Sequence, residues 1–370
     1  MFPARPVPIV FSRLEEAIEQ SHFRIRAPRE YLPFYVTHTQ CTLERLENLS
    51  IEKDESDRVL LLDTSNRDAW YQVDFRMLEP DSSATFHPSH FDQETETFID
   101  ASAAISNSVC LQLYYSMASA FLSFLITKTS INGLLNRGSM FLFSRNHFRN
   151  FIGLPDDWSP VGKKVLDLGA GDGGVTSVFA DFFMHVSVTD ASKIMEWRLA
   201  QRGFTVLAID KWKNSGPYNL ITALNLLDRH FNPTELLADL HEVASESNCL
   251  VMLSIVLPLR PYVEFNPNRT GSTQQLSSIS VSGVRFEDHV NTLIRNTFQP
   301  SGFEVVRWTK LPYLCEGDMV RAFYKLDDAV FLLRPIAKLS ATSSSVSPTY
   351  QAYPSSSTGA VRIPIQHDET

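Results

Sequence analysis

Four glycines within six residues constrain the fold of this 370-residue chain more than any other feature of its sequence. They lie in Asp167-Leu-Gly-Ala-Gly-Asp-Gly-Gly, after an apolar segment that predicts a buried strand and before a segment with apolar residues at helical spacing. Glycines at such a junction let the backbone turn tightly and approach a ligand, and the following helix presents free N–H groups. The loop therefore predicts a nucleotide-like ligand at the carboxyl edge of a sheet; a turn that binds nothing is the alternative.

From residue 163 onward, predicted strands alternate with predicted helices. This order predicts a Rossmann-like α/β fold, with a doubly wound, mostly parallel sheet covered by helices on both faces and an N-terminal helical extension. The expected strands are 165–168, 185–189, 204–209, 218–224, 249–256, 303–308 and 329–333, and the expected helices are 174–183, 192–202, 233–243 and 286–298.

The composition along the chain predicts four regions. Residues 1–100 form a partly irregular N-terminal extension, and residues 101–150 form a helical segment that packs on the catalytic domain of residues 151–336. The tail 337–370 is rich in Ser, Thr and Pro, so we expect it to be disordered. Residues 101–127 carry no charge, but their many hydroxyl and amide groups favour a buried helix over a membrane span.

Charge and cysteine usage exclude some classes of function. Lys and Arg number 33 against 42 Asp and Glu, a net charge of −9, which gives no basic surface for nucleic acid. The four cysteines are widely spaced, so neither a zinc site nor a disulfide scaffold is expected, and no other metal site is predicted. The N-terminal apolar run is broken by prolines and is too short for a secretory leader, which favours a cytoplasmic compartment.

Two ligands compete for the glycine loop. Gly169, Gly171 and Gly174 match the dinucleotide fingerprint G-x-G-x-x-G, but Asp167 and Asp172 would flank its pyrophosphate unfavourably. S-adenosylmethionine has no phosphate and carries a sulfonium and an ammonium group, which carboxylates suit. The loop therefore favours S-adenosylmethionine as the cofactor.

The predicted cofactor site extends beyond the loop. Asp190 lies 21 residues after Gly169 and ends the second expected strand, where it can accept hydrogen bonds from ribose hydroxyls. Asp210, after the third expected strand, would face the adenine amino group, and Arg137 would reach the cofactor carboxylate unless it forms a surface ion pair. The full predicted set is Asp167, Gly169, Gly171, Asp172, Gly173, Asp190, Asp210 and Arg137.

Eight sequence blocks in a fixed order resemble the methyltransferase-like protein 9 family of class I methyltransferases. The resemblance covers about residues 105–335. The blocks are Thr129-Ser-Ile-Asn-Gly-Leu-Leu, Arg137-Gly-Ser-Met-Phe, Leu166-Asp-Leu-Gly-Ala-Gly-Asp-Gly, Asn225-Leu-Leu-Asp-Arg, Val256-Leu-Pro, Arg260-Pro-Tyr-Val-Glu, Leu311-Pro-Tyr-Leu-Cys-Glu-Gly-Asp-Met and Leu326-Asp-Asp-Ala-Val-Phe.

The resemblance implies a substrate and a product. Members of that family methylate the pros nitrogen (Nδ1) of histidine in His-x-His stretches where x is small, so proteins with such stretches would be the partners. The chain itself contains no His-x-His triplet, so it is not expected to methylate itself at one. The resemblance also brings in the endoplasmic reticulum and the mitochondrion as compartments.

Attack by Nδ1 of a neutral imidazole needs little base strength, because the ring is mostly neutral at cellular pH. It requires the proton on Nε2, and an acceptor facing that N–H would select the tautomer and stabilise the imidazolium that forms. Asn225 and Asp228 follow the fourth expected strand, and we expect Asp228 to accept Nε2–H and Asn225 to orient the ring or the peptide. The plainer alternatives are that Asp228 caps the next helix or pairs with Arg229.

Five further residues are predicted to bind the substrate peptide. Tyr262 and Glu264 follow the fifth expected strand at the same edge, and Tyr313, Glu316 and Asp318 place carboxylates near an aromatic ring. Such a group could embrace a histidine-rich, partly cationic peptide; a solvated turn with Tyr313 in the core is the alternative.

Three other functions remain open on the sequence. The chain could methylate a small molecule or another protein side chain. It could bind S-adenosylmethionine without catalysis and scaffold a partner. The dinucleotide fingerprint leaves an NAD-linked oxidoreductase as the third.

Overall fold

The computed structural model describes residues 66–124, 126, 128–263, 265, 274–277 and 279–336. These residues belong to one compact unit. Glu264, the tail 337–370 and most of the predicted N-terminal extension lie outside the described residues.

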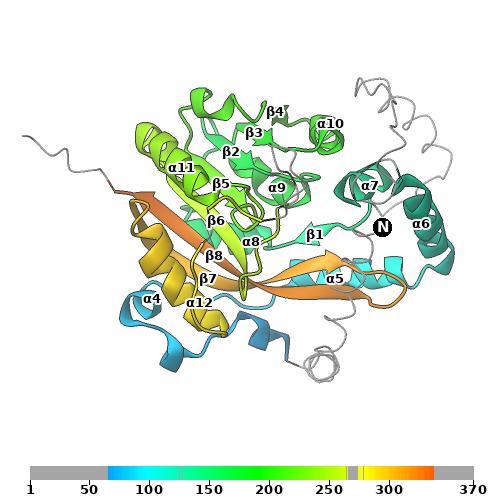
Figure 1. Cartoon of the computed structure of the whole chain (residues 1–370), viewed down its shortest axis with the longest axis horizontal. Coiled ribbons are helices and arrows are strands. Elements are labelled where there is room, and N and C mark those ends of the chain that lie inside the picture. The colour runs from blue at the N-terminus through cyan, green and yellow to red at the C-terminus, as the bar shows by residue number, and fades with distance from the viewer. Residues whose placement is uncertain are drawn as a thin grey trace, which may run out of the picture. The chain divides into compact units, whose positions relative to one another are not determined.

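The described residues form one eight-stranded sheet with the order β1-β7-β8-β6-β5-β2-β3-β4 (Figure 1). The strands β4, β3, β2, β5 and β6 are mutually parallel, and β8 lies antiparallel between β6 and β7. This arrangement confirms the predicted Rossmann-like fold with a mostly parallel sheet. The strands are β1 (Met140–Phe141), β2 (Lys164–Leu168), β3 (His185–Thr189), β4 (Thr205–Val206), β5 (Leu220–Leu224), β6 (Leu250–Leu257), β7 (Phe303–Glu316) and β8 (Phe323–Pro335).

The order of the sheet reverses at β2. The chain runs from β2 through β3 to β4 at one edge and then returns to place β5 on the other side of β2. Connections after β2 and β5 therefore diverge at the carboxyl ends of these strands, which is where open α/β sheets bind ligands. The glycine loop follows β2 directly, so the fold places it at this reversal.

Helices cover both faces of the sheet (Figure 1). Successive residues of a strand point to opposite faces of the sheet and pack in different hydrophobic clusters. Val165 packs in the cluster with α8 and α9, whereas Leu166 packs in the cluster with α11 and α12. The helices are α4 (Pro80–Ala84), α5 (Gln93–Ser106), α6 (Val109–Leu122), α7 (Lys128–Leu135), α8 (Arg145–Ile152), α9 (Gly174–Phe179), α10 (Lys193–Gln201), α11 (Pro233–Ser247) and α12 (Phe286–Leu293).

The ends of two helices follow the local chemistry of the sequence. The Ser192 hydroxyl accepts a hydrogen bond from the Met195 N–H at the start of α10, and Asn232 accepts one from Glu235 at the start of α11. Pro233 occupies the first turn of α11, where its missing N–H has no intrahelical partner to lose.

The last two strands are longer than the apolar pattern predicts. The expected strands 303–308 and 329–333 are parts of β7 and β8, which form one antiparallel hairpin paired from Phe303 and Pro335 to Glu316 and Phe323. Polar and charged residues in the distal half of the hairpin break the apolar pattern, so pairing between the strands extends beyond what periodicity shows.

Residues that precede the predicted helical segment pack into the sheet. Trp70, Tyr71 and Ile99 are buried in the core cluster that contains α8 and α9. Trp308 of β7 holds the segment around α4: its indole N–H donates to the Ser82 carbonyl at 2.7 Å, and its own carbonyl accepts from the His87 N–H at 2.7 Å. The boundaries predicted at residues 100 and 150 thus separate residues that share one core.

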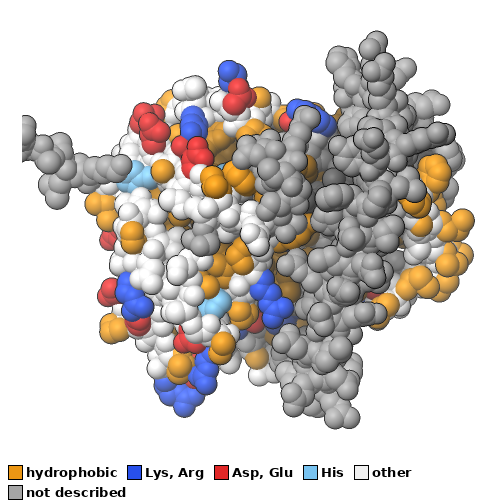
Figure 2. All heavy atoms as spheres, in the orientation of Figure 1, with side chains coloured by type: hydrophobic (Ala, Val, Ile, Leu, Met, Phe, Trp, Pro, Cys, Tyr) orange, Lys and Arg blue, Asp and Glu red, His pale blue; other side chains and the backbone are white. Residues whose placement is uncertain are grey.

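Helix α6 presents an apolar face to solvent. Its exposed side chains include Val109, Leu113, Met117 and Phe121, and hydrophobic side chains gather over α6 at the right edge of Figure 2. Within the residues that the structure describes, no helix has the length and apolar character needed to cross a membrane.

The docking of residues 80–90 on Trp308 gives a stability prediction. We expect Trp308→Ala to lower the free energy of unfolding by about 3–5 kcal/mol, because it empties a fully buried site and removes the partner of the Ser82 carbonyl. Trp308→Phe keeps most of the packing and should lose about 1–3 kcal/mol. Chemical denaturation measures both; near-equal losses for the two variants would contradict the packing role of the indole.

Candidate active site

Asp190 ties the glycine loop to the start of α10. Its two carboxylate oxygens accept hydrogen bonds from the Gly171 N–H at 3.0 Å and the Ser192 N–H at 2.8 Å. The carboxyl end of β3 thus lies directly beside the loop that follows β2. The structure brings together two of the residues predicted to bind the cofactor, and their contact with the cofactor itself stays a prediction.

The loop has the open form that a bound cofactor requires. Gly171 has a φ of +58°, a left-handed conformation that favours glycine, and a Cβ atom built there meets nothing within 4 Å. A ligand can therefore approach the backbone closely at Gly171. Asp172 faces the next turn instead, where it accepts from the Gly174 N–H at 2.9 Å and pairs with Arg202 at 3.2 Å.

Asp167 supports the loop from inside the sheet. Its carboxylate accepts hydrogen bonds of 2.6 Å from the hydroxyls of Thr176 in α9 and Thr222 in β5. Burial raises the pKa of Asp167 to about 6, while the two hydroxyls act in the opposite direction. Both oxygens are thus engaged within the protein, and the observed role of Asp167 is to join β2, α9 and β5.

Arg137 and Asp210 occupy different surroundings. The Arg137 guanidinium lies over the Tyr115 ring, 5.0 Å from its centroid, and its charge helps to lower the pKa of Asp318. Asp210 has an exposed side chain and pairs with its neighbour Lys211 at 3.6 Å. The structure leaves the predicted cofactor contacts of both residues as predictions.

Asn225 and Asp228 lie at the carboxyl end of β5, and both are buried. Asn225 has a φ of +52°, and its N–H donates to the carbonyl and the hydroxyl of Ser254 on β6, both at 3.1 Å. Its side-chain Nδ2 donates to Oδ2 of Asp328 on β8 at 2.7 Å. Three neighbouring strands therefore fix the position of Asn225.

Asp228 is buried, and its carboxyl group is under-paired. Burial raises its pKa to about 6, and the Arg229 charge opposes this. The Arg229 Nε lies 3.9 Å from the carboxylate, so the ion pair that was the plainer alternative is a long one. The capping alternative fails, because Asn232 caps α11.

Three buried oxygens at this place have no hydrogen-bond donor among the described residues: Oδ1 of Asn225, Oδ1 of Asp228 and Oδ1 of Asp328. A buried acceptor without a donor costs about 1–3 kcal/mol, more when it is charged. Such groups in a folded protein call for an explanation, and functional binding is one. The cluster is therefore suited to a ligand that brings N–H groups.

Sequence reasoning gave Asp328 no role, although it lies in this cluster. It is fully buried on β8 opposite Val256 of β6 and Leu311 of β7. Burial raises its pKa to about 8, with the nearby charge of Asp228 acting in the same direction. The only signal in the sequence was the pair of carboxylates, Asp327 and Asp328, directly before the apolar run of residues 329–333.

Tyr313 of β7 lies near the cluster of Asn225, Asp228 and Asp328. It is buried, and burial raises the pKa of its phenol, with the charges of Cys315, Asp328 and Asp228 acting in the same direction. Its hydroxyl contacts the sulfur of Met140. Tyr313 therefore lies close to the two acids of the cluster, but it also belongs to the core, as the alternative expected.

The remaining predicted substrate residues are partly engaged elsewhere. The backbone N–H of Tyr262 donates to the Asp228 carbonyl at 3.0 Å, which places it beside the cluster. Buried Glu316 accepts from the Gly138 N–H at 3.3 Å. Asp318 accepts from the N–H groups of Val320 and Arg321 and from the Tyr324 hydroxyl, so it stabilises the turn of the hairpin.

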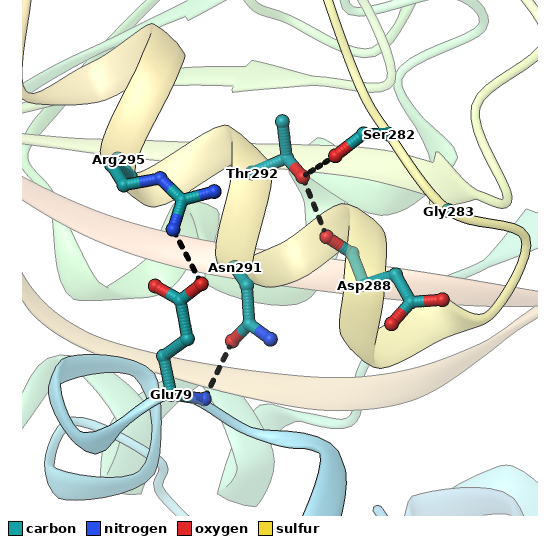
Figure 3. A pocket seen from close by; sticks show the side chains of 7 residues that line it. All are labelled: Glu79, Ser282, Gly283, Asp288, Asn291, Thr292 and Arg295. Carbon is teal, nitrogen blue, oxygen red and sulfur yellow. Dashed lines mark hydrogen bonds and ion pairs between the residues drawn. The ribbon is translucent and has the colours of Figure 1, made fainter.

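A separate polar pocket of about 190 Å³ lies between α12 and the residues before α4 (Figure 3). The Arg295 guanidinium pairs there with Glu79 at 2.5 Å, and Oδ1 of Asn291 accepts from the Glu79 N–H at 3.0 Å. None of the predicted site residues lines it. In the described ranges, no three His, Cys, Asp or Glu side chains group closely enough to hold a metal ion.

Comparison with known proteins assigns the family. The family pattern described as DREV methyltransferase matches residues 70–335, which is most of the chain. The chain belongs to the DREV methyltransferase family. This match begins at Trp70, where the described core also begins, and so includes residues that the resemblance noted in the sequence left out.

Several solved structures are similar at low identity. Magnesium protoporphyrin IX methyltransferase from Synechocystis with S-adenosylmethionine bound is 16% identical, with 67% of this chain and 100% of that chain covered and a TM-score of 0.32. The YcgJ protein from Bacillus subtilis is 10% identical, covering 52% and 100%, with a TM-score of 0.32. DesVI from Streptomyces venezuelae is 15% identical, covering 52% and 77%, with a TM-score of 0.25. Because these scores are low, the assignment rests on the family match and the sheet order.

Family membership makes this chain a methyltransferase, and its cofactor is S-adenosylmethionine, as the glycine loop predicted. The residues present fit that cofactor, because the loop at Gly171 is open and Asp190 lies beside it. The alternative of an NAD-linked oxidoreductase is excluded by the family.

The open loop gives a prediction with a matched control. Gly171→Ala and Gly162→Ala both add a Cβ at positive φ (+58° and +71°) with no protein atom within 4 Å, so we expect each to lose about 1–2 kcal/mol of stability. Only Gly171→Ala should also weaken S-adenosylhomocysteine binding, by tenfold or more, because its methyl group enters the ligand's space. Calorimetric titration measures this; equal affinities for the two variants would place the cofactor elsewhere.

Proposed function

We propose that this methyltransferase acts on protein histidine, transferring a methyl group to the pros nitrogen (Nδ1) in His-x-His stretches. The observation that carries the proposal is the pair of unsatisfied buried acceptors on Asn225 and Asp228 at the carboxyl end of β5. A neutral imidazole that attacks through Nδ1 carries its proton on Nε2, and that N–H is a donor of the kind these acceptors lack. The resemblance to the methyltransferase-like protein 9 family supports the same substrate.

Asp228 accepts the Nε2–H of the substrate ring. Its pKa of about 6 leaves it ionised at neutral pH, so it can take a hydrogen bond and stabilise positive charge on the ring. S-adenosylmethionine, when bound, supplies an electrophilic methyl group on a sulfonium. Transfer would form the N–CH3 bond as the S–CH3 bond breaks, with the electron pair of that bond going to sulfur, and the ring would then release its Nε2 proton to Asp228 or to water.

The pH dependence of this arrangement has a definite sign. Asp228 binds a proton as the pH falls through about 6 and then no longer offers a charged acceptor. Protonation of the substrate imidazole removes the attacking lone pair over a similar range. Activity should therefore fall on the acid side, for two reasons that act in the same direction.

Asn225 orients the acceptor group. Because its Nδ2 is engaged by Asp328, its amide oxygen is the atom available to the substrate ring or to a peptide N–H. Proteins with His-x-His stretches would be the partners. The proposed flanking contacts to the substrate are Tyr262, Tyr313, Glu316 and Asp318. Glu264 is proposed for the same role on its sequence position alone.

Methylation of a small molecule or of another protein side chain is equally compatible with the family. Failure of the chain to methylate the His-Ala-His peptide in the test below would favour this alternative, although no contact in the described residues favours a particular small molecule.

The proposed function is tested by incubating the full chain with S-adenosylmethionine and a peptide that contains His-Ala-His. We expect one added methyl group, which fragmentation and comparison with standards should assign to Nδ1. A matched peptide with alanine at both histidines should gain none. Methylation of the Nε2 position, or of the alanine peptide at the same rate, would contradict the proposal.

The role of Asp228 is tested with the same peptide. Asp228→Asn and Asp228→Ala should lower kcat/KM by about 100-fold or more, the scale expected for a lost proton acceptor, while S-adenosylhomocysteine affinity stays within about twofold. Asp327→Asn is the control, because Asp327 pairs with Lys310 and Lys325 and does not belong to the cluster. Full turnover by Asp228→Ala would remove Asp228 from the mechanism.

A further inference from the structure

Asp327 and Asp328 are adjacent acids in very different surroundings. Asp327 is partly exposed and lies between two lysines, Lys310 and Lys325. Asp328 is fully buried, and its carboxyl group accepts a 2.7 Å hydrogen bond from the Asn225 amide. A fully buried acid beside a second buried acid, Asp228, destabilises the fold, so its presence calls for a functional explanation.

The direct contact of Asp328 is with the predicted acceptor site. Its Oδ2 accepts the 2.7 Å hydrogen bond from Nδ2 of Asn225, although the two residues are 103 positions apart in the chain. The backbone of Asn225 is held independently by Ser254. The rotation of the amide about its last side-chain bond is therefore the freedom that Asp328 controls.

A carboxyl oxygen that accepts hydrogen bonds distinguishes the NH2 group of a side-chain amide from its oxygen. An oxygen that carries no proton accepts from the NH2 group and is repelled by the amide oxygen, which has no hydrogen to donate. With the NH2 group held by Asp328, the Asn225 oxygen is the atom left without a donor in the described residues. Were the amide reversed, an NH2 group would replace that oxygen and could not accept from an imidazole or peptide N–H.

We propose that Asp328 is a positioning residue for the methyl acceptor: it fixes the Asn225 amide so that the amide oxygen is presented to the substrate. This inference rests on the proposed function, because it assigns the direction of a substrate contact at that site. Asp328 itself need not touch the substrate.

The protonation of Asp328 gives the inference a spectroscopic signature. The groups that face it are Asn225 and Asp228 after β5, Ser254 and the Ile255 N–H on β6, and Tyr313 on β7. Burial, followed by the charge of Asp228, raises its pKa to about 8, against the hydrogen bonds from Asn225, Ser254 and Ile255. At neutral pH Asp328 therefore holds a proton, and Asp228 carries the negative charge of the pair.

The experiment follows the side-chain amide of Asn225 by NMR in the full chain labelled with 15N-asparagine, with its signal assigned by its loss in Asn225→Asp. In the unaltered protein and in Asp327→Asn, we expect the signal to move with a midpoint near pH 8, as Asp328 ionises. In Asp328→Asn, which keeps the shape and an accepting oxygen, that movement should disappear. An unchanged titration in Asp328→Asn, or none in the unaltered protein, would overturn the inference.

A kinetic arm separates positioning from mere structural support. Asp328→Asn should retain kcat within about threefold at pH 7 and lose any change in kcat near pH 8, whereas Asp328→Ala, which frees the amide, should lose tenfold or more in kcat with unchanged S-adenosylhomocysteine affinity. Equal kcat for Asp328→Ala and the unaltered enzyme would also overturn it. Because the NMR titration uses no peptide, failure of the proposed function and failure of this inference are distinguishable.

Discussion

The carboxyl group of Asp167 joins the three elements that meet at the reversal of the sheet order. Its hydrogen bonds to Thr176 and Thr222 connect β2 to α9 on one side and to β5 on the other. Because the glycine loop follows β2 and the proposed acceptor residues follow β5, this junction sets the distance between the two halves of the proposed site. Burial raises the pKa of this carboxyl group, which means that its ionised form at the junction lowers the stability of the fold.

The proposed acceptor half of the site carries a similar electrostatic cost. Asp228 and Asp328 are buried acids with raised pKa values, and Oδ1 of Asp228 and Oδ1 of Asn225 have no donor in the described part of the chain. In a purely structural core, apolar residues of similar size would be at least as stable. Unsatisfied acceptors at the carboxyl edge of the sheet are better explained by a ligand that supplies N–H groups. The proposed imidazole is such a ligand, and it would gain stability from the negative charge.

Local patterns predicted the part of the molecule that depends on nearby residues. The glycine loop and the starts of α10 and α11 depend on contacts within one or two turns, and the alternation of strands and helices shows in the spacing of apolar residues. The full length of the β7–β8 hairpin, the packing of residues 66–100 and the Asn225–Asp328 contact depend on partners far away in the chain. Periodicity carries no information about such pairs, so the sequence predicted no role for Asp328.

The most direct measurement is a structure of the full chain with S-adenosylhomocysteine and an unmethylated His-x-His peptide. The account predicts the cofactor product against the Gly169–Gly173 loop and one imidazole at the end of β5. The Nδ1 atom of that ring should face the sulfur, and its Nε2 should lie within hydrogen-bonding distance of Asp228. A peptide bound with both rings away from Asn225 and Asp228, or a ring with Nε2 toward the sulfur, would contradict it.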